Sequence, residues 1–508
     1  MSLLTELMRK KSVEGLQEDA RNAGLKRTLS GLDLALIGVG EIVGAGIFSV
    51  TGTAARNHAG PGIILSFVIS GLACMFAGLC YSELSALVPN SGSAYTYVYA
   101  TCGELIGWMV GWDLMLEYLI GAATVAVAWS GYLVNFIETV GDTTLSKSWT
   151  NGPVMFVDGK FLSGAECADC GVINLPAVFI VAFCTFVLCI GIRESATINH
   201  VLVAIKIAVI LLFLFATFGL IEPKNWTPFI PPATEDGKYG FSGVLKASTQ
   251  VFFAYIGFDA VSTCAGETKK PSRDVPIGVL GSLGICTVLY ILVSMNITGI
   301  VNYTEIPTKA PLATVVKLRG MNWLSILISL GGIAGLTSVI LISLLGQPRI
   351  FYAMAYDGLL PPAFARVHPK YRTPFVPTLV SGGVCMIASA LLPLDVLGDI
   401  TSAGTLFAFA LVSLSTGILR YTRPDLDRPF RVPLIALVSP LGFIVCMALI
   451  VLTGWETILR VLIWMAIGFL VYGFYGYRNS RIRTGAPPPE GAAPSLDAAE
   501  EKLKVEKA

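Results

Sequence analysis

The sequence predicts an all-α integral membrane protein with twelve transmembrane helices, and its composition and its long apolar runs support this prediction. Of the 508 residues, 54% are hydrophobic and only 14% are charged, and the mean hydropathy is +0.71. Soluble proteins carry about 25% charged residues, and so few charges cannot cover a hydrophobic core of this size. Alternating apolar and polar strands are absent, so helices are the remaining way to satisfy backbone groups in lipid.

Apolar runs of the ~20 residues that cross a bilayer recur along the chain and define the twelve predicted spans. They lie near residues 34–55, 61–82, 105–137, 173–191, 200–220, 244–265, 276–301, 322–354, 376–393, 400–419, 432–452 and 457–477. We therefore divide the chain into an N-terminal segment (1–30), a transmembrane transporter domain (31–480) and a tail (481–508). The three prolines 487–489 and the mixed charges after them predict that this tail is disordered.

The distribution of lysine and arginine predicts the orientation of the spans. With the N-terminus inside, most basic residues fall in the cytoplasmic segments, which is the bias that sets topology in the membrane. The segment between spans ten and eleven illustrates it with Arg420, Arg423, Arg428 and Arg431. We expect a multi-pass protein of the inner or plasma membrane with both termini in the cytoplasm.

Charge, cysteine and histidine content argue against several other classes of protein. A formal net charge of +1 gives no long-range attraction for nucleic acid. Only Cys167 and Cys170 lie in a polar loop, where they are either free thiols or a local disulfide, and a metal site would need more ligands. The three histidines are far apart, and H-E-x-x-H, G-x-S-x-G and P-loop motifs are absent, which argues against an enzyme or an ATP-driven pump. We expect no cofactor and no metal, and protein partners are left unknown by the sequence.

Two spans carry residues that interrupt a helix. The first contains Gly38, Gly40, Gly44 and Gly46, each weakening the helix by about 1 kcal/mol relative to alanine, although close helix packing also uses small residues. The sixth, near Phe252 to Asp259, has a glycine followed by an acid. Spans one and six correspond if helices one to ten form two repeats, about 31–220 and 240–420, followed by helices eleven and twelve at about 432–477. Paired interruptions of this kind indicate a substrate site near the bilayer midplane.

Several motifs together make the chain resemble the amino acid–polyamine–organocation superfamily, and within it bacterial members of the cationic amino acid transporter family. The motifs are Gly38 to Phe48, Ser91 to Tyr95, Gly111 to Tyr118, Phe253 to Asp259, Glu267 to Pro271, Arg273 to Pro276 and Asp357 to Pro361. The resemblance implies a LeuT-type 5+5 inverted repeat with discontinuous helices 1 and 6. It also implies that the substrate lies between spans one, three, six and eight.

The resemblance assigns backbone groups at the two interruptions to an α-amino acid. The substrate carboxylate is expected at the N–H groups of Ala45, Gly46 and Ile47, where the positive end of a helix dipole also favours an anion. The ammonium group is expected at the carbonyls that end a half-helix, which belong to Ile42, Phe253, Ala254 and Ile256. Phe253 resembles the aromatic gate of the family, although a core position is the commoner fate of phenylalanine.

Charged and small side chains complete the predicted site. Ionisable groups inside the membrane are costly, so Glu41, Glu117, Asp259 and Lys206 are expected to be lined by protein. Lys206 resembles the fifth-span lysine of sodium-independent relatives, where it acts in coupling as a cation mimic or a proton carrier, with a permanent salt bridge as the alternative. Glu117 matches an acid of bacterial relatives and is a second coupling candidate, whereas Glu41 departs from the family pattern. The three carboxylates favour a positive ligand, unless they serve proton coupling, and Ser343 leaves length for a long side chain.

These observations predict a secondary active transporter, or permease. We expect it to carry cationic amino acids such as arginine and lysine by alternating access, without sodium, and either linked to protons or exchanging substrates. A proton-coupled transporter of neutral or broad-range L-amino acids is the alternative, and a transporter-like amino acid sensor is an alternative of a different class.

Overall fold

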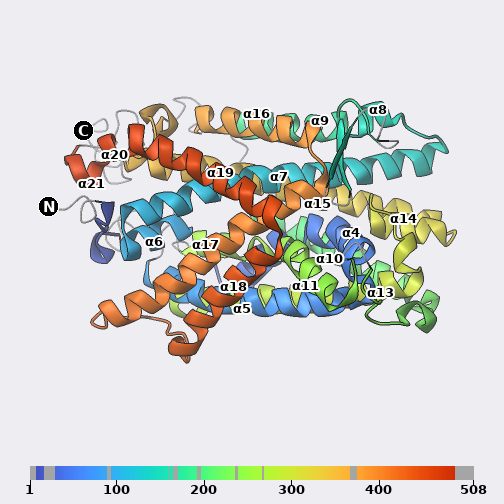
Figure 1. Cartoon of the computed structure of the whole chain (residues 1–508), viewed down its shortest axis with the longest axis horizontal. Coiled ribbons are helices and arrows are strands. Elements are labelled where there is room, and N and C mark those ends of the chain that lie inside the picture. Colours follow the sequence, from blue (N-terminus) through green and yellow to red (C-terminus); the bar gives the residue numbers. More distant parts are fainter. Residues whose placement is uncertain are drawn as a thin grey trace.

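The computed structural model is mostly helical and describes residues 7–16, 29–88, 93–157, 160–163, 167, 170–190, 196–234, 238–265, 268–366 and 374–486. One antiparallel hairpin, β1 (Val154–Val157) and β2 (Lys160–Ser163), pairs Val154 with Ser163, and its two arrows are visible in Figure 1. The prediction of an all-α fold therefore holds for the helical bundle but missed this hairpin. Near it, Cys167 and Cys170 form a disulfide, which decides between the two alternatives for this loop.

Eight helical stretches among the described residues are long and apolar enough to cross a membrane. The long helices that form or contribute to them are α5 (Ile63–Leu87), α7 (Glu104–Gly141), α10 (Ala196–Thr217), α13 (Pro271–Ile300), α15 (Asn322–Tyr356), α17 (Leu394–Thr422), α18 (Ile435–Leu452) and α19 (Trp455–Val471). Predicted spans four and nine are the shorter apolar helices α9 (Leu175–Ile190) and α16 (Phe375–Leu391). The other two predicted spans, one and six, are broken into pieces. The chain is thus a multi-pass membrane protein, and the exact number of twelve spans stays a prediction.

The first span breaks after α3 (Gly31–Ile42). This helix is capped by Ser30, whose side chain accepts from the backbone N–H of Asp33, while the side chain of Asp33 accepts from the backbone N–H of Ser30. The helix ends at Ile42. Val43 leaves the helical region with ψ of 84°. Helical structure resumes with η1 (Gly46–Val50), α4 (Thr51–Ala54) and η2 (Ala55–Ala59), so the glycine-rich segment is where the winding fails.

The sixth span breaks in the same manner. The helix α11 (Gly240–Phe252) tightens into η7 (Phe253–Tyr255), and α12 (Phe258–Thr263) follows after two residues. Of these two, Ile256 is extended and Gly257 has φ of +120°. Residues with a side chain rarely adopt that conformation, so glycine is required here.

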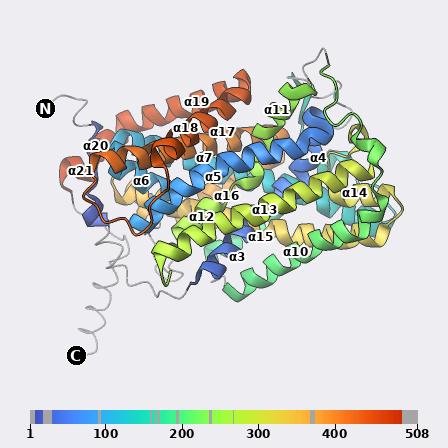
Figure 2. The ribbon, with the colours of Figure 1, turned by 90° about the horizontal axis from the view of Figure 1, so that it is seen from below.

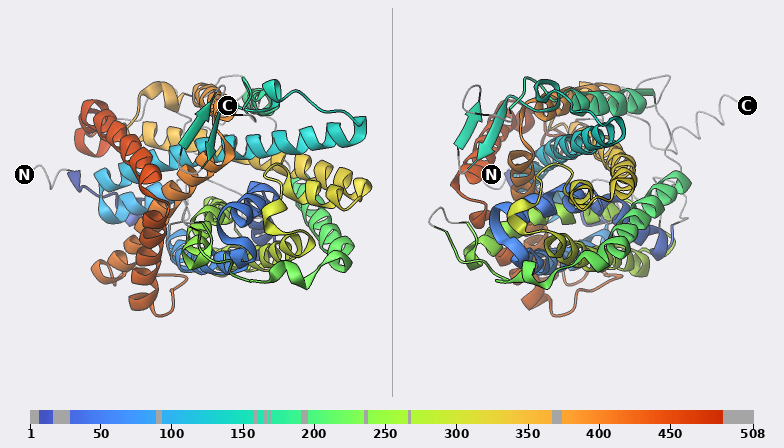
Figure 3. Two further views of the ribbon diagram at one scale, coloured as in Figure 1. Left: turned by 45° about the vertical axis from the view of Figure 1, so that its right-hand side comes forward. Right: turned by 90° about the vertical axis from the view of Figure 1, so that its right-hand side faces the viewer.

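The two breaks lie against each other inside the bundle. A Cβ atom built on Gly46 would lie 2.2 Å from Cα of Ala254, and one built on Gly257 would lie 2.5 Å from Cγ of Glu41. Only glycine allows such close approach of one backbone to the other. Helices α3 and α12 pack beside α13 (Figure 2), and α7 packs against α15 and α17. The right-hand view of Figure 3 looks along the bundle, so many of its helices appear end-on.

Both ends of the described chain lie at the same end of the bundle (Figure 1). Arg9 donates to the carbonyl of Ile482, and Val13 and Leu16 are buried. The C-terminal helices are α20 (Tyr477–Asn479) and α21 (Arg481–Thr484). Residues 481–484 are therefore helical, in contrast to the disordered tail expected from residue 481, while 1–6, 17–28 and 487–508 lie outside the described residues. Three further α-helices are α6 (Ser93–Cys102), α8 (Lys147–Thr150) and α14 (Pro311–Leu318).

A buried ion-pair cluster joins three segments at this end. Glu83, near the end of α5, receives hydrogen bonds from Arg420 of α17 and from the backbone N–H of Val432 at 2.7 Å. Arg428 lies 3.3 Å from the same carboxylate, and its side chain is only 2% exposed. Both arginines pair with the one carboxylate of Glu83, and these ion pairs and hydrogen bonds offset part of the desolvation cost of burying the charges.

Candidate functional site

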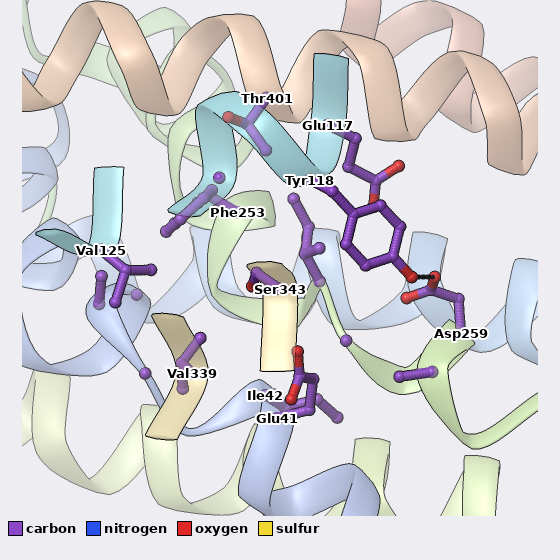
Figure 4. Close-up of a pocket in the computed structure, with 17 residues that line it drawn as sticks. Glu41, Ile42, Glu117, Tyr118, Val125, Phe253, Asp259, Val339, Ser343 and Thr401 are labelled. Carbon is purple, nitrogen blue, oxygen red and sulfur yellow. Dashed lines mark hydrogen bonds between the residues drawn. The ribbon is translucent and has the colours of Figure 1, made fainter. Parts of the chain in front are cut away.

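A cavity lies where the two breaks meet α7, α15 and α17 (Figure 4). The hollow contains about 520 Å³ of space between atoms, open solvent included. From the broken helices it is lined by Glu41, Ile42, Gly44, Ala45, Gly46, Phe253, Ile256, Gly257, Asp259 and Ala260. From the unbroken helices it is lined by Glu117, Tyr118, Gly121, Val125, Val339, Ser343 and Thr401.

Most of the predicted substrate-binding residues come together in this cavity. Those that line it are Glu41, Ile42, Ala45, Gly46, Glu117, Phe253, Ile256, Asp259 and Ser343. Ile47 and Ala254 are not part of the lining, and 0% and 1% of their surface is exposed. Lys206 also lies outside the lining. The pieces of spans one and six therefore bring together residues that are more than 200 positions apart in the sequence.

The hydroxyl of Tyr290 in α13 lies between the two breaks. It is 2.7 Å from the carbonyl oxygen of Ile42 and 2.6 Å from that of Ala254. A hydroxyl has a single proton and donates to one acceptor at a time, so the two carbonyls share one donor. Ala254, predicted to receive the substrate ammonium group, thus has its carbonyl directed at a buried side chain of the protein instead.

Three carboxyl side chains line the cavity, and all are nearly inaccessible. Glu41, Glu117 and Asp259 are 7%, 3% and 2% exposed. The hydroxyl of Tyr118 donates to Asp259 at 3.3 Å, and in Figure 4 these two residues and Glu117 lie on one side of the cavity while Val125 and Val339 lie on the other. None of the described residues that line it is a lysine, arginine or histidine. The cavity wall therefore carries only acidic ionisable groups besides the phenol.

A further acid stands behind the cavity wall. Asp113 lies one helical turn before Glu117 on α7, is fully buried, and has no hydrogen-bond partner among the described residues. Its carboxylate oxygen would lie 3.0 Å from a Cβ atom at Gly404 of α17, so the absence of a side chain at Gly404 makes room for it. In the described part of the chain, no group of three or more His, Cys, Asp or Glu side chains is placed to hold a metal ion.

Lys206 of α10 lies behind the first break. Its side chain is 1% exposed, and its Nζ donates to the carbonyl of Gly40 at 2.6 Å, just before α3 ends. Gly335 of α15 leaves room for it, since a Cβ atom there would lie 3.0 Å from Cγ of Lys206. The ammonium group thus hydrogen-bonds to a carbonyl next to the break and does not line the cavity.

The sequence reasoning missed several residues of the wall, and for some of them a signal exists. Glu117, Gly121 and Val125 are four residues apart on α7, and residues with this spacing share one face of a helix. Starting from Glu117, this periodicity would have predicted the other two. Val339 stands in the same relation to Ser343 on α15. No sequence signal of this kind points to Thr401, because no residue of its helix was in the predicted site.

Comparison with known proteins agrees with this architecture. Residues 29–475 match a family model described as amino acid permease. The chain is 41% identical to the branched-chain amino acid permease BcaP of Bacillus subtilis (strain 168), over 94% of this chain and 99% of that protein. A methylthioribose transporter of the same organism is 39% identical over the same shares of the two chains. Cationic amino acid transporter 4 of Mus musculus is 38% identical over 80% of this chain and 62% of its own length.

Proposed function

The chain belongs to the amino acid permease family, and on that premise we propose that it is a secondary active carrier that moves amino acids across the membrane by alternating access. The observation that carries this proposal is the meeting of two broken helices at one cavity, where free backbone groups can bind a small polar ligand. The breaks lie after Ile42 and at Ile256 and Gly257. Unbroken helices would leave every backbone group paired and the cavity without polar backbone to offer.

The fold of this carrier is proposed to be the twelve-span inverted repeat. Residues 31–220 and 240–420 form its two repeats, and α18 and α19 follow them. The breaks in spans one and six, which are equivalent positions in such repeats, support this assignment. The bias of basic residues supports cytoplasmic termini, and the bacterial relatives support the plasma membrane as its location.

Recognition of the α-amino acid is assigned to the two breaks. The first turn of a helix leaves N–H groups without intrahelical acceptors, so the N–H groups of Ala45, Gly46 and Ile47 bind the substrate carboxylate. The carbonyls of Ile42, Phe253 and Ile256 bind the ammonium group, and the ring of Phe253, which borders the cavity, acts as its gate. The carbonyls of Ile42 and Ala254 share the single proton of the Tyr290 hydroxyl, so one of the two can bind the ammonium group while the other keeps that proton.

The preferred substrates are proposed to be cationic amino acids such as arginine and lysine. Three carboxyls around one cavity, with no basic residue in the described lining, favour a positively charged side chain by Coulomb attraction in a site of low dielectric. The similarity to cationic amino acid transporters agrees with this choice. Ser343 is small and leaves space for a long side chain.

Transport is proposed to be independent of sodium and linked to protons or to exchange. The buried ammonium of Lys206 beside the first break supports this, because a fixed positive charge repels a sodium ion. Buried carboxyls such as Glu117 can carry a proton when they are not paired with a base. Lys206 and Glu117 are therefore the proposed coupling residues, and Glu117 both binds and couples.

A carrier of neutral amino acids is the second candidate. It is supported by the 41% identity to a branched-chain amino acid permease and by the apolar part of the wall at Val125, Val339 and Phe253. In that case the three carboxyls are protonated during substrate binding and serve proton coupling alone.

One experiment tests the proposal and separates the candidates. Purified protein in liposomes is given labelled arginine, lysine or leucine, with and without sodium and with and without an inward proton gradient. Sodium-independent uptake of arginine and lysine supports the proposal, and uptake of leucine alone supports the second candidate. Sodium-dependent uptake would remove the role given to Lys206. Binding of amino acids without flux would instead indicate a sensor.

A further inference from the structure

One wall of the cavity has a notch where α7 carries a glycine. Gly121 lines the cavity between Glu117 and Val125, one helical turn away on either side. A Cβ atom built on Gly121 would meet, among the described atoms outside its own helix, only Cγ2 of Thr401, at 3.5 Å. This is an ordinary van der Waals distance, so the space beside Gly121 fits about one methyl group without strain.

Thr401 of α17 closes the notch with an apolar group. Its hydroxyl donates to the carbonyl of Leu397 in its own helix at 2.9 Å, and its methyl carbon is the atom nearest to Gly121. The notch is therefore made of glycine backbone and a methyl group. Figure 4 shows Thr401 across the cavity from Glu41 and Ile42, which belong to the first break.

We propose that the notch between Gly121 and Thr401 receives the aliphatic part of the substrate side chain and limits its length. The proposal rests on the proposed function, in which the α-carboxylate and α-ammonium groups bind at the breaks. The side chain of a substrate held there extends across the cavity to the wall made by α7 and α17. An apolar notch takes methylene groups and offers nothing to a charged end group, so its ligand is the stem of the side chain.

Glu117 lies at a suitable distance from the notch to bind a charged group at the end of the substrate side chain. It is four residues from Gly121 on the same face of α7, which is about 6 Å along the helix axis. A lysine side chain that passes Gly121 can therefore bring its ammonium group to the carboxyl of Glu117. Neutral substrates would use the notch alone, so the notch sets length and Glu117 sets charge.

Two substitutions change the notch in opposite directions by one methyl group. Gly121→Ala fills it, and Thr401→Ser enlarges it while keeping the hydroxyl that bonds to Leu397. One methylene in an apolar pocket changes discrimination by about 10- to 200-fold. The matched control is Gly131→Ala in the same helix, since a Cβ atom there would lie 3.6 Å from the backbone of Ala310 and Gly131 does not line the cavity.

The test measures competition against labelled substrate uptake in liposomes for two homologous series. Diaminobutyrate, ornithine and lysine form the cationic series, and aminobutyrate, norvaline and norleucine form the neutral series. We expect Gly121→Ala to weaken the longest member of each transported series about 10-fold or more relative to the shortest. Thr401→Ser should improve the longest member, and the double variant should return toward the wild-type order.

The possible results separate the notch from the proposed function. If Gly121→Ala weakens substrates of all lengths equally, or shows the same competition profile as Gly131→Ala, the proposed role of the notch is refuted. Thr401→Ser tests that role independently if Gly121→Ala fails to insert. A wild-type preference for the neutral series would refute cationic substrates, while the dependence on length would still support or refute the notch. Failure of the wild type to transport either series would refute both ideas, because no side chain would then enter the notch.

Discussion

Replacing Tyr290 by phenylalanine tests whether one hydroxyl holds the two breaks together. The ring would keep its packing against Phe67 and Tyr255, at centroid distances of 5.2 and 5.4 Å. Only the donor to the carbonyls of Ile42 and Ala254 would be lost. Both residues are at most 2% exposed, so water cannot readily replace the hydroxyl.

The expected loss of affinity in Tyr290→Phe follows from the number of hydrogen bonds that the hydroxyl can donate. A buried carbonyl without a donor costs about 1–3 kcal/mol, and because the hydroxyl has one proton, the loss counts once rather than twice. If this loss falls on the substrate-bound form, affinity decreases roughly 5- to 150-fold, since ~1.4 kcal/mol is tenfold. We therefore expect KM for uptake to rise within this range in Tyr290→Phe while the amount of inserted protein stays the same.

A matched variant shows whether the effect belongs to the breaks. The hydroxyl of Tyr255, in η7, donates to the carbonyl of Phe67 in α5 at 2.8 Å, so Tyr255→Phe loses a comparable bond that joins the sixth-span break to α5 rather than to the first break. Binding of labelled substrate to purified protein is measured for both variants. Equal changes in the two variants would refute the reasoning. Tighter binding in Tyr290→Phe would also refute it, because the hydroxyl would then be competing with the substrate for Ile42.

Four further substitutions test separate parts of the site and of the fold. Glu41→Gln should weaken cationic substrates more than neutral ones in a competition panel, and equal losses would move Glu41 from recognition to coupling or folding. Phe253→Ala should reduce uptake with normal insertion, and unchanged kinetics would count against a gate. Lys206→Met should abolish uptake driven by a proton gradient while substrate binding remains measurable, so retained gradient-driven uptake would remove Lys206 from coupling. Glu83→Ala should lower the free energy of unfolding by about 3–5 kcal/mol, because it leaves buried arginine charges unpaired. Chemical denaturation in detergent measures this loss, and a clearly smaller loss would contradict the prediction.

The breaks were predictable because their cause is local. Four glycines in one span weaken the helix wherever they occur, and α3 ends within that glycine-rich segment, at Ile42. In the sixth span the glycine of the motif is the residue that takes φ of +120°. The sequence therefore predicted both the presence and the position of the irregular backbone, and the family resemblance named most of the residues that line the cavity there.

The missed features depend on contacts between segments far apart in the chain. The hydroxyl of Tyr290 donates to a carbonyl 248 residues earlier in the chain. A tyrosine within an apolar span gives no sequence signal for such a distant partner. Asp113 is fully buried with Gly404 of α17 beside it, and nothing near Asp113 in the sequence indicates that neighbour. Thr401 joins the wall because α7 and α17 pack together. Helical periodicity describes one helix at a time and cannot supply such pairs.

The division of the site into backbone and wall explains why membership of the family leaves the substrate open. The backbone groups of the breaks exist whatever the side chains are, as long as glycines such as Gly46 and Gly257 allow the two segments to meet. The wall, in contrast, changes its shape and charge with single substitutions at Glu117, Gly121 or Thr401. Relatives named for branched-chain amino acids and for methylthioribose are about equally similar to this chain, and methylthioribose is a sugar rather than an amino acid. Overall identity therefore does not distinguish these ligands, and we propose that the few wall residues do.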